Sequence, residues 1–484
     1  MILGIICGAG LLVLLLAIIA GGLSIIAAGS LILYKTANGN SQSVLFMPVY
    51  DSEEGRTNIV QYNRQVGYVE GEIRQVASDR EQMNVLVLNQ DREAYLCNGY
   101  KVTKISEDVS GRTVVSENGK AFLLKDEQNT LYLVDAKGKQ VEIATQVWTD
   151  DYVISPDGKS VVYFKEDNLY LYQNKETEQI GKNMIPLAVS NKAKYIYAVG
   201  SKKTDSLYLV SKDGEKTKIS SNLIYPYIWV NSGFTEVLFW TEDATYMSFG
   251  GRNKEKVCEA HILPVENAYT TPERHNRVIH SELKTLENAV AYETAEFANI
   301  YGRAEKNYNN TNLYVINRLY TAEEMIEDVE QCRMVNGKKI YYLSQRNLCR
   351  QSAKKSAKPE ILAENVRDYW CSNDRTTLYY LAEDGRLYYY CSNGEDQMIA
   401  EGIIRENVQM SRTGALYYLN PADRGLYMAK RKEKPVLVRE NTDNLLKGKN
   451  NVYFFDTGAD DAKTKEIYME KHSGKFKLIC SFTP

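Results

Sequence analysis

Residues 152–173 read YVISPDGKSVVYFKEDNLYLYQ, and this stretch decides the fold. Three short apolar runs, each typical of a β-strand, are separated by polar turns. The first turn, Ser155–Lys159, contains Pro156, which presets φ, and Gly158, which adopts a positive φ without strain. A fourth short strand is expected around Ile180, after the polar residues that follow. The stretch therefore predicts four strands joined by tight turns, which is an antiparallel meander.

The same unit returns along the chain. An apolar residue followed by Tyr marks each third strand, and successive copies return at a nearly constant interval, apart from one longer step after Thr245-Tyr246. The copies are Ala94-Tyr95, Leu131-Tyr132, Leu169-Tyr170, Leu207-Tyr208, Leu313-Tyr314, Leu387-Tyr388, Leu426-Tyr427 and Ile467-Tyr468. Two degenerate copies keep the register, Thr245-Tyr246 without the apolar residue and Leu348-Cys349 without the Tyr. A tandem unit of four strands with a period of about 40 residues is typical of the blades of a β-propeller. The predicted fold class is therefore all-β.

The number of blades stays open at this stage. The pattern allows about 7–10 repeats, whereas ordinary propellers have 4–8 blades, so two smaller propellers side by side are an alternative. A division between them would fall in the long step between Tyr246 and Leu313. Because the pattern alternates with period two, a helical solenoid is excluded. A propeller ring also has to close, and residues 44–49 are a candidate closing strand.

The N-terminal segment, from Met1 to Tyr34, differs from the rest of the chain. No charged residue occurs from Ile2 to Tyr34, and a helix of that length exceeds the ~30 Å core of a bilayer. One tilted transmembrane helix is therefore predicted. A secretory signal peptide is the alternative, although its apolar region is usually only ~7–15 residues long. The spacing of Gly4 and Gly8 would allow helix–helix association in the lipid bilayer.

These features divide the chain into five segments. They are a transmembrane anchor (1–34), a juxtamembrane tether with the candidate closing strand (35–66), a first set of propeller repeats (67–262), a partly helical insertion (263–310) and a second set of repeats (311–484). Apolar residues at helical spacing between His275 and Tyr301 predict a surface helix, inserted between blades.

The charge balance limits the partners. The chain has 59 Lys and Arg against 62 Asp and Glu, a formal net charge of −3. Binding to nucleic acid requires a concentrated positive surface, so the composition argues against a nucleic-acid partner.

Candidate functional residues are few. Cys258, His261, His275 and His280 have a spacing that could suit zinc, although the usual second Cys is missing, and chance clustering is the alternative. The sequence lacks a Gly-x-Ser-x-Gly elbow, a phosphate-binding Gly-x4-Gly-Lys loop and an EF-hand pattern. We therefore predict no catalytic residue, no cofactor-binding residue and no enzyme activity.

Two stretches resemble known families. Residues 153–164, VISPDGKSVVYF, resemble the blade signature of TolB-type propellers, and Tyr-rich repeats such as Asn336–Leu343 are similar to membrane-anchored propeller proteins of clostridial bacteria. The resemblance covers about residues 73–260 and 311–484. It implies a bacterial protein of the cell envelope, anchored in the cell membrane by a single pass, with its propeller outside the cytoplasm.

The predicted function follows from the scaffold and the resemblance. We expect a non-catalytic, membrane-anchored propeller that acts as a binding scaffold or sensor for a protein, peptide or glycan, held by variable loops at its top face. One alternative is a propeller-type glycosidase or lyase with carboxylates on inner strands. The other is an accessory subunit of an envelope complex that associates through its anchor.

Overall fold

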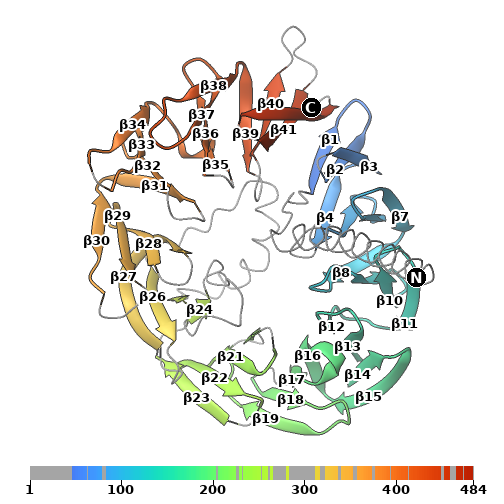
Figure 1. The fold of residues 1–484 in the computed structure, drawn as a ribbon. Coiled ribbons are helices and arrows are strands. Elements are labelled where there is room, and N and C mark those ends of the chain that lie inside the picture. Colours follow the sequence, from blue (N-terminus) through green and yellow to red (C-terminus); the bar gives the residue numbers. More distant parts are fainter. Residues whose placement is uncertain are drawn as a thin grey trace, which may run out of the picture. The chain divides into compact units, whose positions relative to one another are not determined.

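The computed structural model confirms the meander at residues 152–173 (Figure 1). Strands β12 (Tyr152–Ile154), β13 (Ser160–Lys165), β14 (Asn168–Gln173) and β15 (Glu176–Lys182) pair in that order, each antiparallel to the next. The turn before β13 has the predicted chemistry, since Gly158 has a φ of +72°. Its N–H donates to the Ser155 carbonyl at 2.8 Å, and the Ser155 Oγ accepts from the Ser160 amide at 3.0 Å.

The structure describes residues 46–482, apart from 63, 79–82, 203–204, 225–227, 232, 252, 260–261, 265–278, 283–310, 317–321, 336–338, 353–356, 373–376, 393, 412–413, 448–451, 458–464 and 473. These described residues belong to one compact unit, Leu45–Pro484.

Strands form ten sheets in the described part of the chain, and eight of these have four strands in meander order. One of the eight is β12–β15. The first four of the other seven are β4–β7 (Ile73–Ser78, Val85–Asn89, Ala94–Cys97, Val102–Ser106), β8–β11 (Val109–Val115, Ala121–Asp126, Leu131–Asp135, Gln140–Ala144), β16–β19 (Met184–Val189, Ile196–Gly200, Leu207–Val210, Lys216–Ser220) and β20–β23 (Trp229–Val230, Glu236–Trp240, Thr245–Phe249, Asn253–Cys258). The last three are β31–β34 (Val366–Cys371, Leu378–Ala382, Leu387–Tyr389, Gln397–Ala400), β35–β38 (Val408–Met410, Leu416–Asn420, Gly425–Ala429, Val436–Arg439) and β39–β42 (Thr442–Lys447, Val452–Thr457, Lys465–His472, Lys475–Phe482). Two short 3-10 helices also lie among the described residues, η1 (Asn191–Ala193) and η3 (Arg405–Asn407).

The other two sheets depart from four strands. The first sheet has three, β1 (Met47–Asp51), β2 (Arg56–Gln61) and β3 (Arg64–Glu70). The seven-stranded sheet contains β24 (Ile262–Pro264), β25 (Ile279–Glu282), β26 (Thr311–Ile316), β27 (Ala322–Val335), β28 (Lys339–Ser344), β29 (Asn347–Ser352) and β30 (Glu360–Ala363). Successive sheets follow the chain around a ring (Figure 1), which is the architecture of a β-propeller with each four-stranded sheet as a blade.

The repeated apolar-Tyr pair has a defined structural role. In every copy the pairing register shifts between the apolar residue and the next residue, so a β-bulge separates the two where the third strand meets the fourth. A bulge bends a strand and increases its twist. The motif therefore marks the place where each blade bends.

The tyrosine of the motif also holds its own blade together. In five blades its ring stacks on the aromatic residue directly opposite on the second strand, with centroids 5.1 to 5.8 Å apart. These pairs are Tyr163–Tyr170, Phe239–Tyr246, Tyr380–Tyr388, Tyr418–Tyr427 and Phe454–Tyr468. Cross-strand aromatic pairs of this kind stabilise a sheet by roughly 0.2–1 kcal/mol each.

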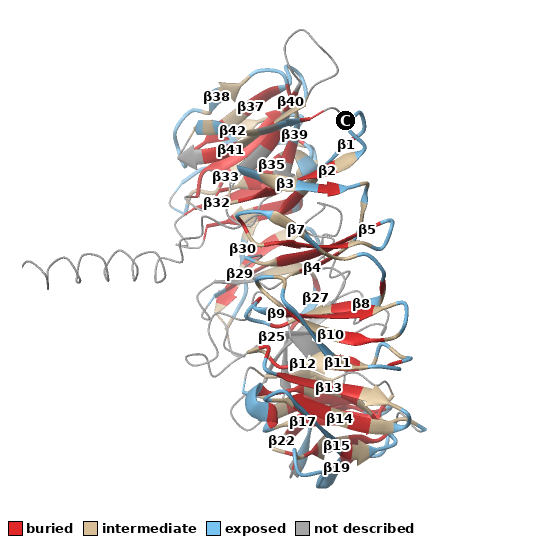
Figure 2. Ribbon diagram, turned by 90° about the vertical axis from the view of Figure 1, so that its right-hand side faces the viewer, coloured by how far each residue is buried: buried red, intermediate tan, exposed pale blue. Residues whose placement is uncertain are grey.

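The apolar residue of the motif instead faces the next blade. Leu169 is fully buried and packs with Met184, Val189 and Ile196 of the following blade, whereas Tyr170 packs in a cluster shared with the preceding one. The period-two alternation of a strand places neighbouring residues on opposite faces. Burial accordingly follows the strands, while the turns are exposed (Figure 2).

The same rule closes the ring. Ile467 occupies the apolar motif position of the last blade, and it packs with Met47 and Val49 of β1 in a buried cluster. Figure 1 shows the first sheet beside the last one, and β42 contacts β1 and β3. Residues 47–49 of the candidate closing strand lie in β1, while residues 44 and 45 lie outside the described residues. β1 pairs with β2 and not with a described strand of the last blade. Side-chain packing therefore joins the two ends of the propeller.

The seven-stranded sheet explains the long step in the repeat. It contains two consecutive repeats, β24–β27 and β27–β30, because β27 pairs with β26 through its first half and with β28 through its second half. Both repeats have the bulge at the motif, at Leu313/Tyr314 and at Leu348/Cys349. The extra length of the long step therefore falls between β24 and β26, within the first of these two repeats.

Two predictions about this region are wrong. The helix expected from His275 is not seen: Ile279–Glu282 is strand β25, paired with β24 and β26, and the rest of the expected helix lies outside the described residues. Short apolar runs fit strand and helix alike, and sheet pairing decides between them. The alternative of two propellers is not realised either, because β23 contacts β27 across the predicted division.

The predicted localisation as a single-pass membrane protein also needs correction. In the part of the chain that the structure describes, no helix is both long and apolar enough to cross a membrane. The prediction rested on the charge-free run of residues 1–34. That run, with Gly4 and Gly8, lies outside the described residues.

Candidate functional site

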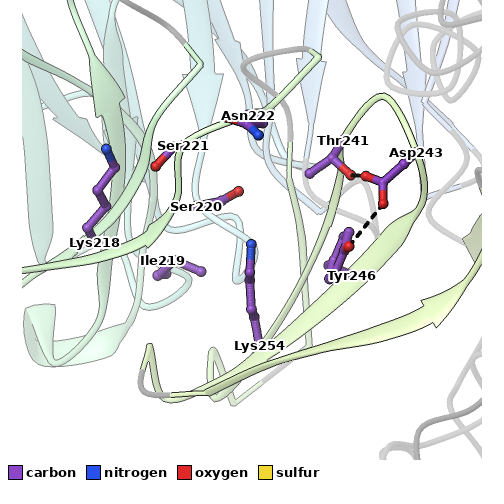
Figure 3. Close-up of a pocket in the computed structure, with 9 residues that line it drawn as sticks. All are labelled: Lys218, Ile219, Ser220, Ser221, Asn222, Thr241, Asp243, Tyr246 and Lys254. Carbon is purple, nitrogen blue, oxygen red and sulfur yellow. Dashed lines mark hydrogen bonds between the residues drawn. The ribbon is translucent and has the colours of Figure 1, made fainter.

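A pocket of about 540 Å³ lies where blade β16–β19 meets blade β20–β23. The residues around it come from β19 and the connection that follows, from the turn between β21 and β22, and from β22 and β23 (Figure 3). They are Lys218, Ile219, Ser220, Ser221, Asn222, Thr241, Asp243, Tyr246 and Lys254. Turns between second and third strands and connections between blades lie at the same end of an antiparallel meander, so the pocket is on that face of the ring.

The connection between these two blades shapes the pocket. Leu223 anchors it, since this side chain is 6% exposed and packs with Tyr197 and Phe239. The Leu223 amide donates to the Asp205 carbonyl of the preceding blade at 2.8 Å, and Leu223 forms a β-bridge with Thr241 of the following blade. The connection is therefore tied to both blades, and the residues before Leu223 border the pocket.

One wall of the pocket is a hydrogen-bonded carboxylate. Asp243 Oδ1 accepts from Thr241 Oγ1 at 2.5 Å, and Oδ2 accepts from the Tyr246 hydroxyl at 3.2 Å. The hydrogen bond from Thr241, assisted by that from Tyr246, lowers the pKa of Asp243. This carboxylate is therefore ionised at neutral pH and keeps lone pairs that can accept from a ligand.

The aromatic ring in the pocket is covered by other groups. Tyr246, the tyrosine of the Thr245-Tyr246 motif copy, stacks on Phe239 with centroids 5.8 Å apart. The Lys254 ammonium lies 5.0 Å from the Tyr246 ring centroid. A ligand in the pocket would therefore meet polar groups and not a free aromatic face.

Two lysines bring positive charge to the pocket. Lys218 and Lys254 are both exposed, and each has a tyrosine ring beneath it, with Lys218 Nζ 5.9 Å from the Tyr208 centroid. Within the described residues neither lysine forms an ion pair. Lys256, on the same strand as Lys254, differs in this respect, because its Nζ lies 2.5 Å from Glu259 Oε1. The pocket therefore offers two ammonium groups without a carboxylate partner.

Ser220 is the least exposed polar side chain of the pocket. Only 3% of the residue is exposed, and its Oγ has no hydrogen-bond partner among the described residues. Figure 3 shows this oxygen directed into the pocket. Buried hydroxyl groups nearly always have a partner, so an orphaned one facing a cavity indicates a place for a ligand or an ordered water.

Only two of the four predicted zinc ligands, Cys258 and His280, are among the described residues. Cys258 ends β23 and His280 lies in β25, which belong to different sheets, while His261 and His275 lie outside the described residues. No group of three or more His, Cys, Asp or Glu in the described part of the chain could hold a metal ion. The zinc site therefore stays an untested prediction.

Sequence reasoning did not find the pocket residues. Tyr246 belongs to a copy of the repeated motif, whereas Ser220 and Lys254 belong to no motif. The spacing of these two residues is close to one blade period, which is the only signal that could have related them.

Comparison with known proteins shows low similarity throughout. No protein-family model matches the sequence, and no curated protein matches it. The solved structures with some likeness include PorZ, described as a surface component of the type-IX secretion system of Porphyromonas gingivalis (TM-score 0.30, 9% identity, 85% of this chain and 67% of that chain). They also include the Cps50 (Swd1) β-propeller domain of Myceliophteria thermophila (0.32, 12%, 57% and 95%) and BamB from Moraxella catarrhalis (0.32, 12%, 63% and 92%). The β-propeller assignment therefore rests on the strand pairing and blade order described above.

Proposed function

We propose that this protein is a non-catalytic β-propeller scaffold that binds a glycan in the pocket between blades β16–β19 and β20–β23. The observation that carries this proposal is the character of the lining. Of the nine residues, only Ile219 is aliphatic, and it is buried, whereas the others offer hydroxyl, amide, carboxylate and ammonium groups. Such a lining suits a ligand with many hydroxyl groups.

A peptide fits this pocket less well. Peptides are usually recognised by pairing with a sheet edge or by apolar pockets for their side chains. The described lining has one aliphatic side chain, the buried Ile219, and so offers little to an apolar peptide side chain. The Asp243 carboxylate can instead accept hydrogen bonds from a sugar ring, and the Asn222 amide can both donate and accept them.

The carboxylate supports binding without catalysis. Glycoside hydrolysis ordinarily uses two carboxyl groups, one of which has a raised pKa so that it can act as an acid. Among the described lining residues Asp243 is the one carboxylate, and the Thr241 hydrogen bond lowers its pKa. The described lining therefore does not supply the pair of carboxyl groups that a glycosidase ordinarily uses.

The test compares two equivalent aspartates. Asp423 accepts a hydrogen bond from Tyr427 at 2.6 Å in blade β35–β38, just as Asp243 does from Tyr246, but it does not line the pocket. The full chain and the Asp243→Asn and Asp423→Asn variants are applied to an array of immobilised glycans, and the best ligand is then titrated in solution.

We expect Asp243→Asn to weaken binding about tenfold, because one hydrogen bond to a charged group is lost, and Asp423→Asn to leave it unchanged. Absence of any bound glycan, or equal losses in both variants, would refute the proposal. Breakdown of the bound glycan with turnover would instead favour the enzyme alternative.

A second observation favours an additional protein partner. The residue opposite the motif on the outermost strand is exposed and apolar in the last four blades, at Ile361, Met398, Leu437 and Leu478, with exposures of 42–56%. Earlier blades have polar residues at the same position, namely Lys104, Glu142, Gln179, Lys218 and Lys256. Contiguous exposed apolar patches mark interaction surfaces, and we propose that these repeated residues contribute to such a surface.

Basic neighbours suggest the chemistry of that partner. Lys475 and Lys477 precede Leu478, and Lys434 lies three residues before Leu437. The proposed partner is therefore a protein with apolar and acidic side chains. A photo-crosslinker placed at Leu437 or Leu478 should capture one defined protein in cells, whereas the same group at Lys256 should not. Equal capture at all three positions would remove this candidate.

A further inference from the structure

We infer that the glycan of the proposed function carries an anionic group, a carboxylate or a sulfate, and that Lys254 and Ser220 bind this group. The inference rests on the proposed function and specifies its substrate class. The described lining contains two lysines and one aspartate, a net charge of +1 (2 − 1) for these residues, in a chain whose formal net charge is −3. Local positive charge in an acidic protein favours an anionic ligand.

The arrangement of the donors supports an oxyanion. In Figure 3 the Lys254 ammonium points toward the side of the pocket where Ser220 Oγ lies, and Asn222 borders the same side. An oxyanion accepts several hydrogen bonds at once, and bonds from an ammonium are charge-assisted and therefore stronger than those between neutral groups. An oxyanion would give the orphaned Ser220 hydroxyl a partner and would neutralise the unpaired lysine.

The opposite wall explains why the anion belongs to a sugar. Asp243 is ionised and would repel a second negative charge placed beside it. It would instead accept hydrogen bonds from hydroxyl groups. A sugar with one acidic substituent presents an anion to Lys254 and hydroxyls to Asp243, whereas an acidic peptide would offer further carboxylates.

The test compares two acidic probes with an uncharged one. A glucuronate-containing tetrasaccharide, its methyl ester and a sulfated tetrasaccharide are titrated calorimetrically against the full chain. We expect the acidic and the sulfated forms to bind about tenfold more tightly than the ester, since the ester loses the charge-assisted bonds. This preference should weaken as the salt concentration rises.

Matched variants locate the effect. Lys254→Met should abolish the preference for the acidic form, while Lys256→Met, on the same strand but paired with Glu259, should keep it. Ser220→Ala should weaken binding of the acidic form several-fold. Ser248→Ala should not, because Ser248 is also a buried serine whose Oγ has no described partner, but it lies outside the pocket.

The outcomes separate the two proposals. Equal affinity for the acid and its ester would overturn the anionic class and leave glycan binding intact. Binding to neither sugar would overturn both. A polyglutamate peptide that binds as tightly as the acidic sugar, with the same loss in Lys254→Met, would replace the glycan by an acidic protein segment.

Discussion

Ring closure by side-chain packing can be tested at Ile467. This residue is fully buried between the last blade and β1, in contact with a cluster that contains Met47 and Val49. The Ile467→Ala change removes three carbon atoms from that interface. If the two ends of the propeller pack as described, the change creates a cavity between them.

The magnitude follows from the burial. Removing three buried carbons costs about 2.4 kcal/mol at ~0.8 kcal/mol per methylene. The cavity left in a close-packed interface adds to this, so we expect a loss of about 3–4 kcal/mol in the free energy of unfolding, within the usual range for Ile→Ala. Leu478 on the adjacent strand is 42% exposed, and we expect Leu478→Ala to cost less than about 1 kcal/mol.

The assay is urea unfolding of the full chain, followed by tryptophan fluorescence and far-ultraviolet circular dichroism. Ile467→Ala should lower the midpoint clearly more than Leu478→Ala does, with an unchanged slope. A double-mutant cycle with Val49→Ala should give a coupling energy of about 0.5–3 kcal/mol, because residues in contact are not additive. Equal midpoints for Ile467→Ala and Leu478→Ala, together with zero coupling to Val49, would show that the chain ends are not packed.

Two further predictions concern turns and buried tyrosines. Gly158→Ala should destabilise the protein by about 1–3 kcal/mol, and more than Gly55→Ala does. Both positions have a positive φ, but only at Gly158 would the new Cβ lie 2.6 Å from the Ala121 side chain. Equal midpoints of thermal unfolding for the two variants would contradict this. Burial raises the pKa of Tyr163 to about 12 from its ordinary value of 10. The stability that neutral Tyr163 contributes should therefore be complete below pH 10 and lost as the pH rises from 10 to 12, and a Tyr163→Phe variant should lose less stability over that range. A difference in thermal unfolding between the two proteins that does not change with pH would rule this out.

Local sequence features predicted the fold well. The turn residues Pro156 and Gly158 and the apolar-Tyr period predicted strands, meander order and the repeat. These features depend on backbone preferences of a few adjacent residues, so they can be read without a structure. The helix expected from His275 is not seen at Ile279–Glu282 for the matching reason, because Ile279 pairs with Val315, a residue far away in the sequence.

The candidate site could not be predicted in the same way. Ser220 and Lys254 belong to different blades, and their proximity depends on how two sheets pack. The orphaned state of Ser220 Oγ is likewise a property of its surroundings, since nothing in the adjacent sequence distinguishes it from the hydrogen-bonded Ser155. Tyr246 has two roles that its sequence position does not separate, because it stacks on Phe239 within its blade and also lines the pocket.

The repeating unit and the alternation within each strand could be inferred from the amino-acid sequence, because both follow from local turn chemistry and the period of two. Only the tertiary structure decided that Leu169 faces the following blade, that Ile467 faces the first sheet, and that two lysines and a buried serine line one pocket. The physical reason is that packing between sheets joins residues a full blade or a full ring apart, and such contacts depend on the bend and twist of every blade between them.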